Sequence, residues 1–236
     1  MASVFHSDIE LYFSLYTTDS KVSVVGEECH HIMKVMRHSV GDSIYVTNGN
    51  GKIFLINITS MAKNEIKGEI EKSFQYENKL KQFTICIPRL RVIDRFEFAL
   101  EKCVELGFTN FIVFETDRTL ARGDKSDRWQ KIAMAAMKQS LQSYLPNITY
   151  LNKVNKFNEL EGLKITFDQN SEKHFSDVIK TFHQNEKYYL IFGPEGGLTE
   201  DETTLLGKSN VYKLTSNRLR TETAIITAAS IISTNF

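Results

Sequence analysis

Cysteine is scarce in this chain of 236 residues. The three cysteines, Cys29, Cys86 and Cys103, are odd in number and far apart, and no two of them form a Cys-x-x-Cys pair. This spacing disfavours a disulfide framework and a zinc site, and it fits a reducing compartment. His30 and His31 have no third ligand at metal-binding spacing, so we expect no metal site.

The chain also lacks a targeting signal and a long apolar run. The first residues contain His6, Asp8 and Glu10, where a signal peptide would need an apolar segment. The longest apolar stretch near the C-terminus, 224–232, is interrupted by hydroxyl residues and is much shorter than the about 20 apolar residues that cross a bilayer. We therefore expect no membrane association and a cytoplasmic location.

A surplus of positive charge is absent as well. The chain has 29 Lys and Arg residues against 29 Asp and Glu residues. Proteins that coat nucleic acids non-specifically usually carry a basic surplus, so any nucleic-acid site on this chain must be a local patch. The 42% content of hydrophobic residues is enough to build the core of one large domain or two small ones.

The N-terminal third has the pattern of a small β-rich domain. Residues 43–47 and 52–58 read as strands, and they flank Asn48-Gly49-Asn50-Gly51, which favours a hairpin turn. Residues 65–72 alternate in the manner of an edge strand, and 27–37 predict a short helix with Ile32, Val35 and Met36 facing the sheet. A compact barrel with no role beyond packing is the simplest interpretation of this pattern.

The rest of the chain alternates short apolar runs with helical segments, which predicts an α/β layer with a largely parallel sheet. We assign residues 1–74 to the first domain and 75–236 to the second, with a linker near 73–82. The expected strands are 83–87, 111–114, 164–167, 188–192 and 211–214. The expected helices are 94–106, closed by Gly107, and one that starts at Ser126 and carries Trp129 on its apolar face.

The loop Gly193–Gly197 is the first candidate for a ligand site. It follows the apolar strand 188–192 directly and leads into Thr199-x-x-Glu202, the pattern of a helix capping box. Glycines allow the backbone to approach a ligand closely, and ligands of open α/β sheets bind beyond the carboxyl ends of strands. The spacing matches neither a P-loop nor Gly-x-Gly-x-x-Gly, which disfavours a nucleoside triphosphate or a dinucleotide.

A second segment, Asn217–Ala224, places two arginines and a glutamate between the expected strand 211–214 and an apolar C-terminal helix. Together with the glycine loop, this segment closely resembles the last two motifs of the SPOUT class of RNA methyltransferases. The string Arg-Thr-Glu-Thr-Ala at 220–224 is similar to that of the 16S rRNA uridine-N3 methyltransferase family (RsmE). The resemblance extends over nearly the whole chain. It includes 30–37, 105–107, Asp117-Arg118, Arg128-Trp129 and Gln139-Ser140.

The resemblance implies a SPOUT-type α/β domain with a C-terminal trefoil knot, preceded by a small PUA-like β-barrel that binds RNA. It implies S-adenosyl-L-methionine as cofactor, 16S ribosomal RNA or the small ribosomal subunit as substrate, and a homodimer. The cofactor-binding residues it implies are Phe192, Gly193, Glu195, Gly196, Gly197, Leu214, Asn217 and Leu219. The family usually has glycine where this chain has Thr215, so we expect the backbone to approach the cofactor less closely at that position.

Clustered arginines indicate where RNA would bind. Two basic loops, 88–95 and 118–125, follow the carboxyl ends of predicted strands. They could therefore form one basic rim that binds RNA phosphates. The alternative is that these charged residues form only a solvated surface, as most charge runs do. The predicted RNA-binding residues are Arg37, Arg89, Arg91, Arg118, Arg122 and Arg128.

Arg220 and Glu222 are the candidate catalytic residues. Methylation of a uridine ring nitrogen removes an imide proton, so a cation should stabilise the developing oxyanion. We predict that Arg220 supplies this cation and that Glu222 orients it or relays the proton. A structural ion pair between the two at a helix start is the alternative, and Arg218 is expected at the surface. A SPOUT enzyme for another RNA nucleotide, or a non-catalytic RNA-binding factor, remains open.

Overall fold

The structure is a computed structural model that describes residues 9–236. His6, Asp8 and the start of the predicted domain 1–74 lie outside the described residues. The chain divides into two compact units, the first running up to Asn78 and including Met137–Leu145, the second formed by Lys79–Ala136 and Pro146–Phe236. The predicted boundary at residues 74 and 75 stays a prediction.

The first unit is a six-stranded sheet in the order β1-β4-β5-β6-β3-β2. All neighbouring strands are antiparallel except β1 and β4, which pair in parallel. The strands are β1 (Leu11–Phe13), β2 (Tyr16–Thr17), β3 (Lys21–Val25), β4 (Ser43–Thr47), β5 (Lys52–Ala62) and β6 (Glu65–Gln75). The hairpin turn between β4 and β5 is confirmed, and the Asn48 Oδ1 atom accepts hydrogen bonds from the backbone N–H groups of Asn50 (2.8 Å) and Lys52 (3.2 Å).

Two expectations for this unit are wrong. β6 is not an edge strand, because it pairs with β5 on one side and with β3 on the other. The expected helix divides into α1 (Gly26–His30) and a π-helical turn, His31–Val35, which shifts the register of the side chains. Ile32 is fully buried as expected, but Val35 and Met36 are 59% and 37% exposed.

The second unit is a six-stranded, fully parallel sheet in the order β12-β10-β11-β7-β8-β9. The predicted α/β layer with a parallel sheet is thereby confirmed. The strands are β7 (Phe83–Pro88), β8 (Asn110–Phe114), β9 (Asn147–Leu151), β10 (Leu163–Phe167), β11 (Tyr188–Ile191) and β12 (Val211–Tyr212). The helices are α2 (Ile93–Glu105), α3 (Ser126–Gln139), α4 (Phe175–Val178), α5 (Glu200–Leu206) and α6 (Thr221–Asn235), and the end of α3 from Met137 onward belongs to the first unit.

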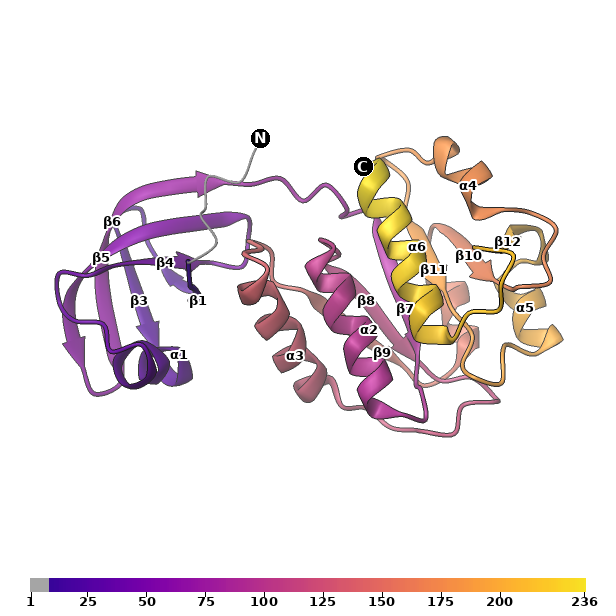
Figure 1. Ribbon diagram of the computed structural model, residues 1–236, viewed down its shortest axis with the longest axis horizontal. Coiled ribbons are helices and arrows are strands. Elements are labelled where there is room, and N and C mark those ends of the chain that lie inside the picture. The colour runs from indigo at the N-terminus through magenta and orange to yellow at the C-terminus, as the bar shows by residue number, and fades with distance from the viewer. Residues whose placement is uncertain (1–8) are drawn as a thin grey trace. The chain divides into compact units, whose positions relative to one another are not determined.

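Two helix pairings of the second unit bear on the site. α2 and α6 pack along each other, and α6 also contacts β7 (Figure 1). α5 packs against β10 and the 3₁₀ turn Val154–Glu159. Because all six strands run in the same direction, their carboxyl ends and the loops that follow lie along one edge of the sheet. Within the described part of the chain, no helix has the length and apolar character needed to span a membrane.

Candidate functional site

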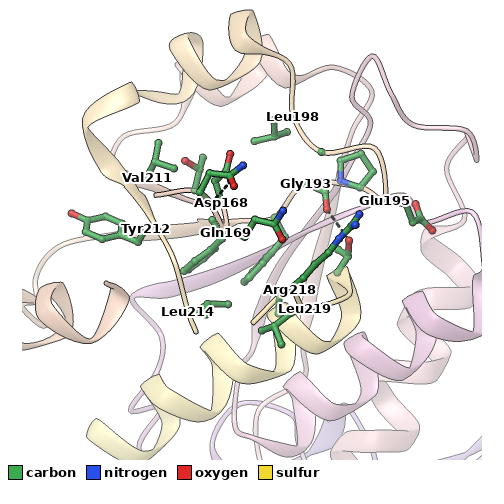
Figure 2. A pocket seen from close by; sticks show the side chains of 18 of the residues that line it. Asp168, Gln169, Gly193, Glu195, Leu198, Val211, Tyr212, Leu214, Arg218 and Leu219 are labelled. Carbon is green, nitrogen blue, oxygen red and sulfur yellow. Dashed lines mark hydrogen bonds between the residues drawn. The ribbon is translucent and has the colours of Figure 1, made fainter. Parts of the chain in front are cut away.

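A cavity of about 380 Å³ lies at the carboxyl ends of β10, β11 and β12. Figure 2 shows the loop after β11 on one side of this cavity, the end of β12 on the other, and Asp168 and Gln169 between them. Four segments of the chain line the cavity, together with the side chains of Arg118 and Thr203. The first two segments are Thr166–Asn170 and Phe192–Leu198. The other two supply Val211, Tyr212, Leu214 and Thr215, and Asn217, Arg218, Leu219, Thr221 and Ala224. The cavity volume falls in the usual range for small-molecule sites.

The glycine loop forms one wall, and its geometry favours glycine at its start. A Cβ atom on Gly193 would lie 3.1 Å from the Gly197 Cα atom and 3.2 Å from the Leu198 backbone nitrogen. The loop closes through a hydrogen bond from the Gly197 N–H group to the Pro194 carbonyl (2.8 Å), and Gly197 has a φ of 72°. This tight turn presents backbone groups to the cavity without side chains in the way.

The predicted capping box ends the loop and starts α5. The Thr199 hydroxyl oxygen accepts from the Glu202 N–H group (3.2 Å), and the Glu202 carboxylate accepts from the Thr199 N–H group (2.8 Å). This prediction is confirmed. The box fixes the direction in which the chain leaves the cavity.

Two aromatic rings underlie the cavity. Phe167 at the end of β10 and Phe192 after β11 are stacked, with ring centroids 4.6 Å apart and an interplanar angle of 12°. Beside them, Thr166 is 2% exposed, and its hydroxyl oxygen has no hydrogen-bond partner among residues 9–236. A flat apolar group with a polar atom toward Thr166 would match this surface.

Charged side chains of both signs surround this apolar surface. Asp168 and Glu195 contribute carboxylates, and Arg118 and Arg218 contribute guanidinium groups. A ligand that combines an apolar ring with both positive and negative groups is complementary to such a lining. Among the described residues, no group of three or more His, Cys, Asp or Glu side chains is arranged to hold a metal ion.

All eight residues predicted to bind the cofactor line this one cavity, and their role there stays a prediction. Asp168 and Gln169 are not among the predicted site residues, although a run of polar residues directly after the predicted strand 164–167 is a usable signal. Arg218 was predicted to lie at the surface. Arg218 is exposed, as expected, but it lines the cavity too.

The Thr215 side chain stabilises a local turn with Asn217. The Thr215 hydroxyl group donates to the Asn217 carbonyl (3.0 Å) and accepts from the Asn217 N–H group (3.2 Å). Both residues line the cavity. The hydroxyl therefore stabilises the loop at the position where the resembled family usually has glycine.

The candidate catalytic residues lie next to the cavity, on either side of Thr221. Arg220 is exposed and precedes α6, while Thr221 lines the cavity and its hydroxyl donates to the Gly193 carbonyl (3.1 Å). The Glu222 side chain is 14% exposed, and its carboxylate lies 3.5 Å from the Arg95 guanidinium of α2. The ion pair that the structure records for Glu222 is therefore with Arg95, which sequence reasoning did not select.

Arg89 is buried, which does not fit the predicted contact with RNA. It is 3% exposed, and its guanidinium carbon lies 5.1 Å from the ring centroid of Trp129 and 5.7 Å from that of Phe96. Burial lowers the pKa of the guanidinium group. Because Trp129 and Phe96 come from two different helices, we reassign Arg89 to holding α2 and α3 on the sheet through cation–π contacts.

Arg91 and Arg118 contact the glycine loop. The Arg91 backbone N–H group donates to the Glu195 carboxylate (3.1 Å), and the Arg91 residue is exposed. The Arg118 guanidinium donates to the carbonyl groups of Gly196 (2.8 Å) and Leu198 (3.4 Å). Both basic loops therefore meet the cavity wall.

Arg122 belongs to a polar cluster around Glu115, a carboxylate that is 6% exposed. Glu115 accepts hydrogen bonds from Arg122 (2.8 Å), from the Gly123 N–H group (2.6 Å) and from the Tyr150 hydroxyl. Burial raises the pKa of Glu115, but these hydrogen bonds together lower it below its usual value. Burial and the bond to Glu115 raise the pKa of Tyr150 to about 12.

The other two predicted RNA-binding arginines are exposed. Arg128 makes two hydrogen bonds to the Glu97 carboxylate, at 2.5 and 3.0 Å. Arg37 lies in the first unit at a φ of 60°, just after the π-helical turn.

Comparison with known proteins yields two family matches. The family model for the RNA methyltransferase domain matches residues 77–233, and the model for the RNA methyltransferase PUA domain matches residues 26–71. The predicted PUA-like domain followed by a SPOUT-type α/β domain is thereby confirmed, apart from the knot.

Relatives of known name cover almost the whole chain. The chain is 28% identical over 230 residues to the ribosomal RNA small subunit methyltransferase E of Bacillus subtilis, covering 89% of each protein. It is also 28% identical to the ribosomal RNA small subunit methyltransferase E 1 of Borreliella burgdorferi, over 89% of this chain and 91% of that protein. A solved ribosomal RNA small subunit methyltransferase E from Neisseria gonorrhoeae, bound to S-adenosyl methionine, shares the fold, with a TM-score of 0.85, 24% identity and 97% and 98% of the two chains covered.

Proposed function

The chain belongs to the RNA methyltransferase family, and we propose that it methylates the N3 ring nitrogen of a uridine in the 16S RNA of the small ribosomal subunit, with S-adenosylmethionine as methyl donor. The observation that carries the proposal is the single cavity into which the glycine loop and the 217–224 segment converge. The names of the relatives support small-subunit ribosomal RNA as the substrate. We place the reaction in the cytoplasm because ribosomal RNA is the substrate.

The cavity fits S-adenosylmethionine. Its stacked Phe167 and Phe192 rings suit an adenine ring, and the buried Thr166 hydroxyl can supply a polar partner. Asp168 and Glu195 suit the positive charges of the sulfonium and amino groups, and the glycine loop leaves room for close backbone contact. When bound, the cofactor supplies an electrophilic methyl group on a positively charged sulfur.

The chain's own residues must hold the uracil ring and help its N3 atom to lose a proton. As the N–H bond breaks, negative charge develops on the uracil carbonyl oxygens, and a nearby guanidinium stabilises that charge. Arg220 lies one residue before the cavity-lining Thr221 and is exposed, so its guanidinium is open to an incoming nucleotide. Arg95 holds the Glu222 carboxylate in the first turn of α6, close to Arg220 in the chain.

A product assay tests the proposed function. Small ribosomal subunits from a strain that lacks the gene are incubated with the protein and S-adenosylmethionine, and the RNA is digested to nucleosides for mass spectrometry. We expect N3-methyluridine. Another methylated nucleoside would assign the enzyme to a different target, and cofactor binding without any product would contradict methylation of this RNA.

The role of Arg220 is tested by single-turnover kinetics. Arg220→Ala should lower the methylation rate by roughly 10²-fold if the guanidinium stabilises the developing oxyanion. Arg220→Lys should recover little, because a compact ammonium group does not reproduce the planar donor fork. A normal rate per folded Arg220→Ala molecule would exclude Arg220 from the chemistry.

We further propose that the enzyme is a homodimer. One face of α6, with Ile225, Ala228, Ala229 and Ile232, is buried within the chain, whereas Ile226 and Ile231 on its other sides are only partly buried. On α2, which packs along α6, Phe98 is 50% exposed, so apolar side chains remain that a second copy could cover. Sedimentation velocity tests this directly, and a monomer at micromolar concentration would refute it.

The knot also remains a proposal. After β12, which pairs only with β10 among the described strands, the chain passes the Gly193 loop, where Thr221 bonds to the Gly193 carbonyl. α6 then packs on α2 beside β7. This path, from the edge strand β12 past the earlier Gly193 loop to α6, supports a trefoil knot in which the C-terminal segment is threaded through a loop. A crystal structure that traces the path would test the knot.

A further inference from the structure

The loop after β8 and the glycine loop after β11 are joined by side-chain hydrogen bonds. Arg118 reaches across 78 residues of sequence to the Gly196 carbonyl (2.8 Å), and it also donates to the Leu198 carbonyl (3.4 Å). One residue earlier, the Asp117 N–H group donates to the Glu202 carboxylate (2.9 Å). We call these contacts the Arg118 bracket.

Glu202 makes the bracket rigid, because its two carboxylate oxygens serve different loops. One oxygen accepts from Asp117, and the other accepts from the Thr199 N–H group of the capping box (2.8 Å). The Glu202 residue is only 7% exposed, so water has little access to its carboxylate. The end of the glycine loop is therefore held to the neighbouring loop by a buried acceptor.

Arg118 also packs against the backbone of the glycine loop. A Cβ atom built on Gly196 would meet the Arg118 Cβ atom at 3.3 Å and its Cδ atom at 3.4 Å. The aliphatic part of Arg118 thus packs on the Gly196 backbone while its guanidinium binds the carbonyl groups on either side of Gly197. Arg118 also lines the cavity. It is therefore part of the cavity wall as well as part of the basic loop 118–125.

We propose that Arg118 is a positioning residue for the cofactor: it fixes the orientation of the Gly196–Leu198 backbone that faces S-adenosylmethionine. This inference rests on the proposed function. A loop held in its binding conformation loses less conformational freedom when the ligand binds, so the bracket raises affinity without itself needing to contact the cofactor. The sequence had predicted RNA contact for Arg118, and this placement gives its guanidinium a role within the protein.

Calorimetric titration with S-adenosylmethionine, in the absence of RNA, tests the inference. Arg118→Ala should weaken cofactor binding by roughly fivefold to tenfold, since it removes charged hydrogen bonds at a partly exposed site. Arg118→Lys should bind with intermediate affinity, because the ammonium group keeps the charge but lies one bond closer to the backbone than the Nη1 atom that donates to both carbonyl groups. Millimolar guanidinium ion should restore part of the affinity of Arg118→Ala.

Arg91→Ala is the matched control. Arg91 is also an exposed arginine beside the glycine loop, but it contacts Glu195 through its backbone N–H group, which the substitution keeps. Its cofactor affinity should equal that of the wild type. In steady-state methylation, Arg118→Ala should raise the KM for S-adenosylmethionine while kcat at saturating cofactor changes little.

The outcomes separate this inference from the proposed function. Wild-type protein that does not bind S-adenosylmethionine would refute the proposed function first. If the wild type binds and Arg118→Ala binds equally well, or if only the KM for RNA rises, Arg118 does not position the cofactor loop. If Arg118→Ala does not fold, Arg118→Lys decides, and wild-type affinity in that variant would overturn the inference.

Discussion

Replacement of Glu202 by alanine should destabilise the second unit far more than replacement of an exposed glutamate in the same short helix would. The substitution removes the acceptor for two backbone N–H groups, those of Thr199 (2.8 Å) and Asp117 (2.9 Å). Loss of the capping interaction costs about 1 kcal/mol, and a poorly hydrated N–H group left without an acceptor costs about 1–3 kcal/mol. Because water can reach Asp117, which is exposed, we take the lower end and expect about 2–3 kcal/mol in total.

This loss is measurable through the only tryptophan of the chain. Trp129 is fully buried in the second unit, so its fluorescence reports the unfolding of that unit. For a protein of this size, about 2–3 kcal/mol corresponds to a decrease in Tm of roughly 4 to 12 °C. Glu200→Ala is the matched control, because Glu200 lies in the same first turn of α5 but is exposed. If Glu202→Ala lowers Tm no more than Glu200→Ala does, the carboxylate does not join the two loops.

Two further predictions concern the cavity and the polar cluster beside it. Gly196→Val should weaken S-adenosylmethionine binding at least about tenfold while the protein stays folded, because the new side chain would begin 3.3 Å from the Arg118 Cβ atom; unchanged affinity by calorimetry would contradict this. Tyr150→Phe should lower the free energy of unfolding by about 1–2 kcal/mol near neutral pH, since it removes a hydrogen bond to the Glu115 carboxylate. The lowered pKa of Glu115 stabilises the fold above the pKa of about 4.5 in the unfolded chain and stops doing so as the pH falls through the folded-state value. The difference between wild type and Tyr150→Phe in urea unfolding should therefore shrink below about pH 4.5, and a difference that stayed constant there would refute the assignment.

Most of the sheet architecture could be predicted because it depends on local patterns. Buried parallel strands appear as continuous apolar runs, and the hairpin turn carries its own Asn-Gly signal. β9 was missed because Asn147 and Thr149 interrupt its apolar residues. The position of β6 inside the sheet depends on its pairing with β3, at least 40 residues earlier, which its own alternation does not reveal.

The features of the site also differ in whether they depend on residues close in sequence or far apart. The glycine loop and the capping box were predictable because the requirement for glycine and the Thr-x-x-Glu spacing are local. The environment of Arg89 was not, since it is created by Trp129, a residue 40 positions away on another helix. The same holds for Glu222, whose ion-pair partner Arg95 comes from α2 and not from the neighbouring Arg220.

Several arginines of the second unit therefore stabilise the fold, a role that their sequence pattern does not indicate. Arg95, Arg122 and Arg128 each pair with a carboxylate of the second unit, and the chain as a whole has no net charge. A cation already paired with a carboxylate attracts phosphate weakly, because the carboxylate field opposes it over the same distance. In the two basic loops, attraction for RNA should thus depend most on Arg91, Arg118 and Lys125, which are exposed and form no ion pair with a carboxylate among the described residues. The number of arginines in these loops is therefore larger than the number of positive charges available to RNA. Some of these arginines stabilise the protein itself, as Arg122 does by pairing with Glu115 and Arg118 by binding the glycine loop.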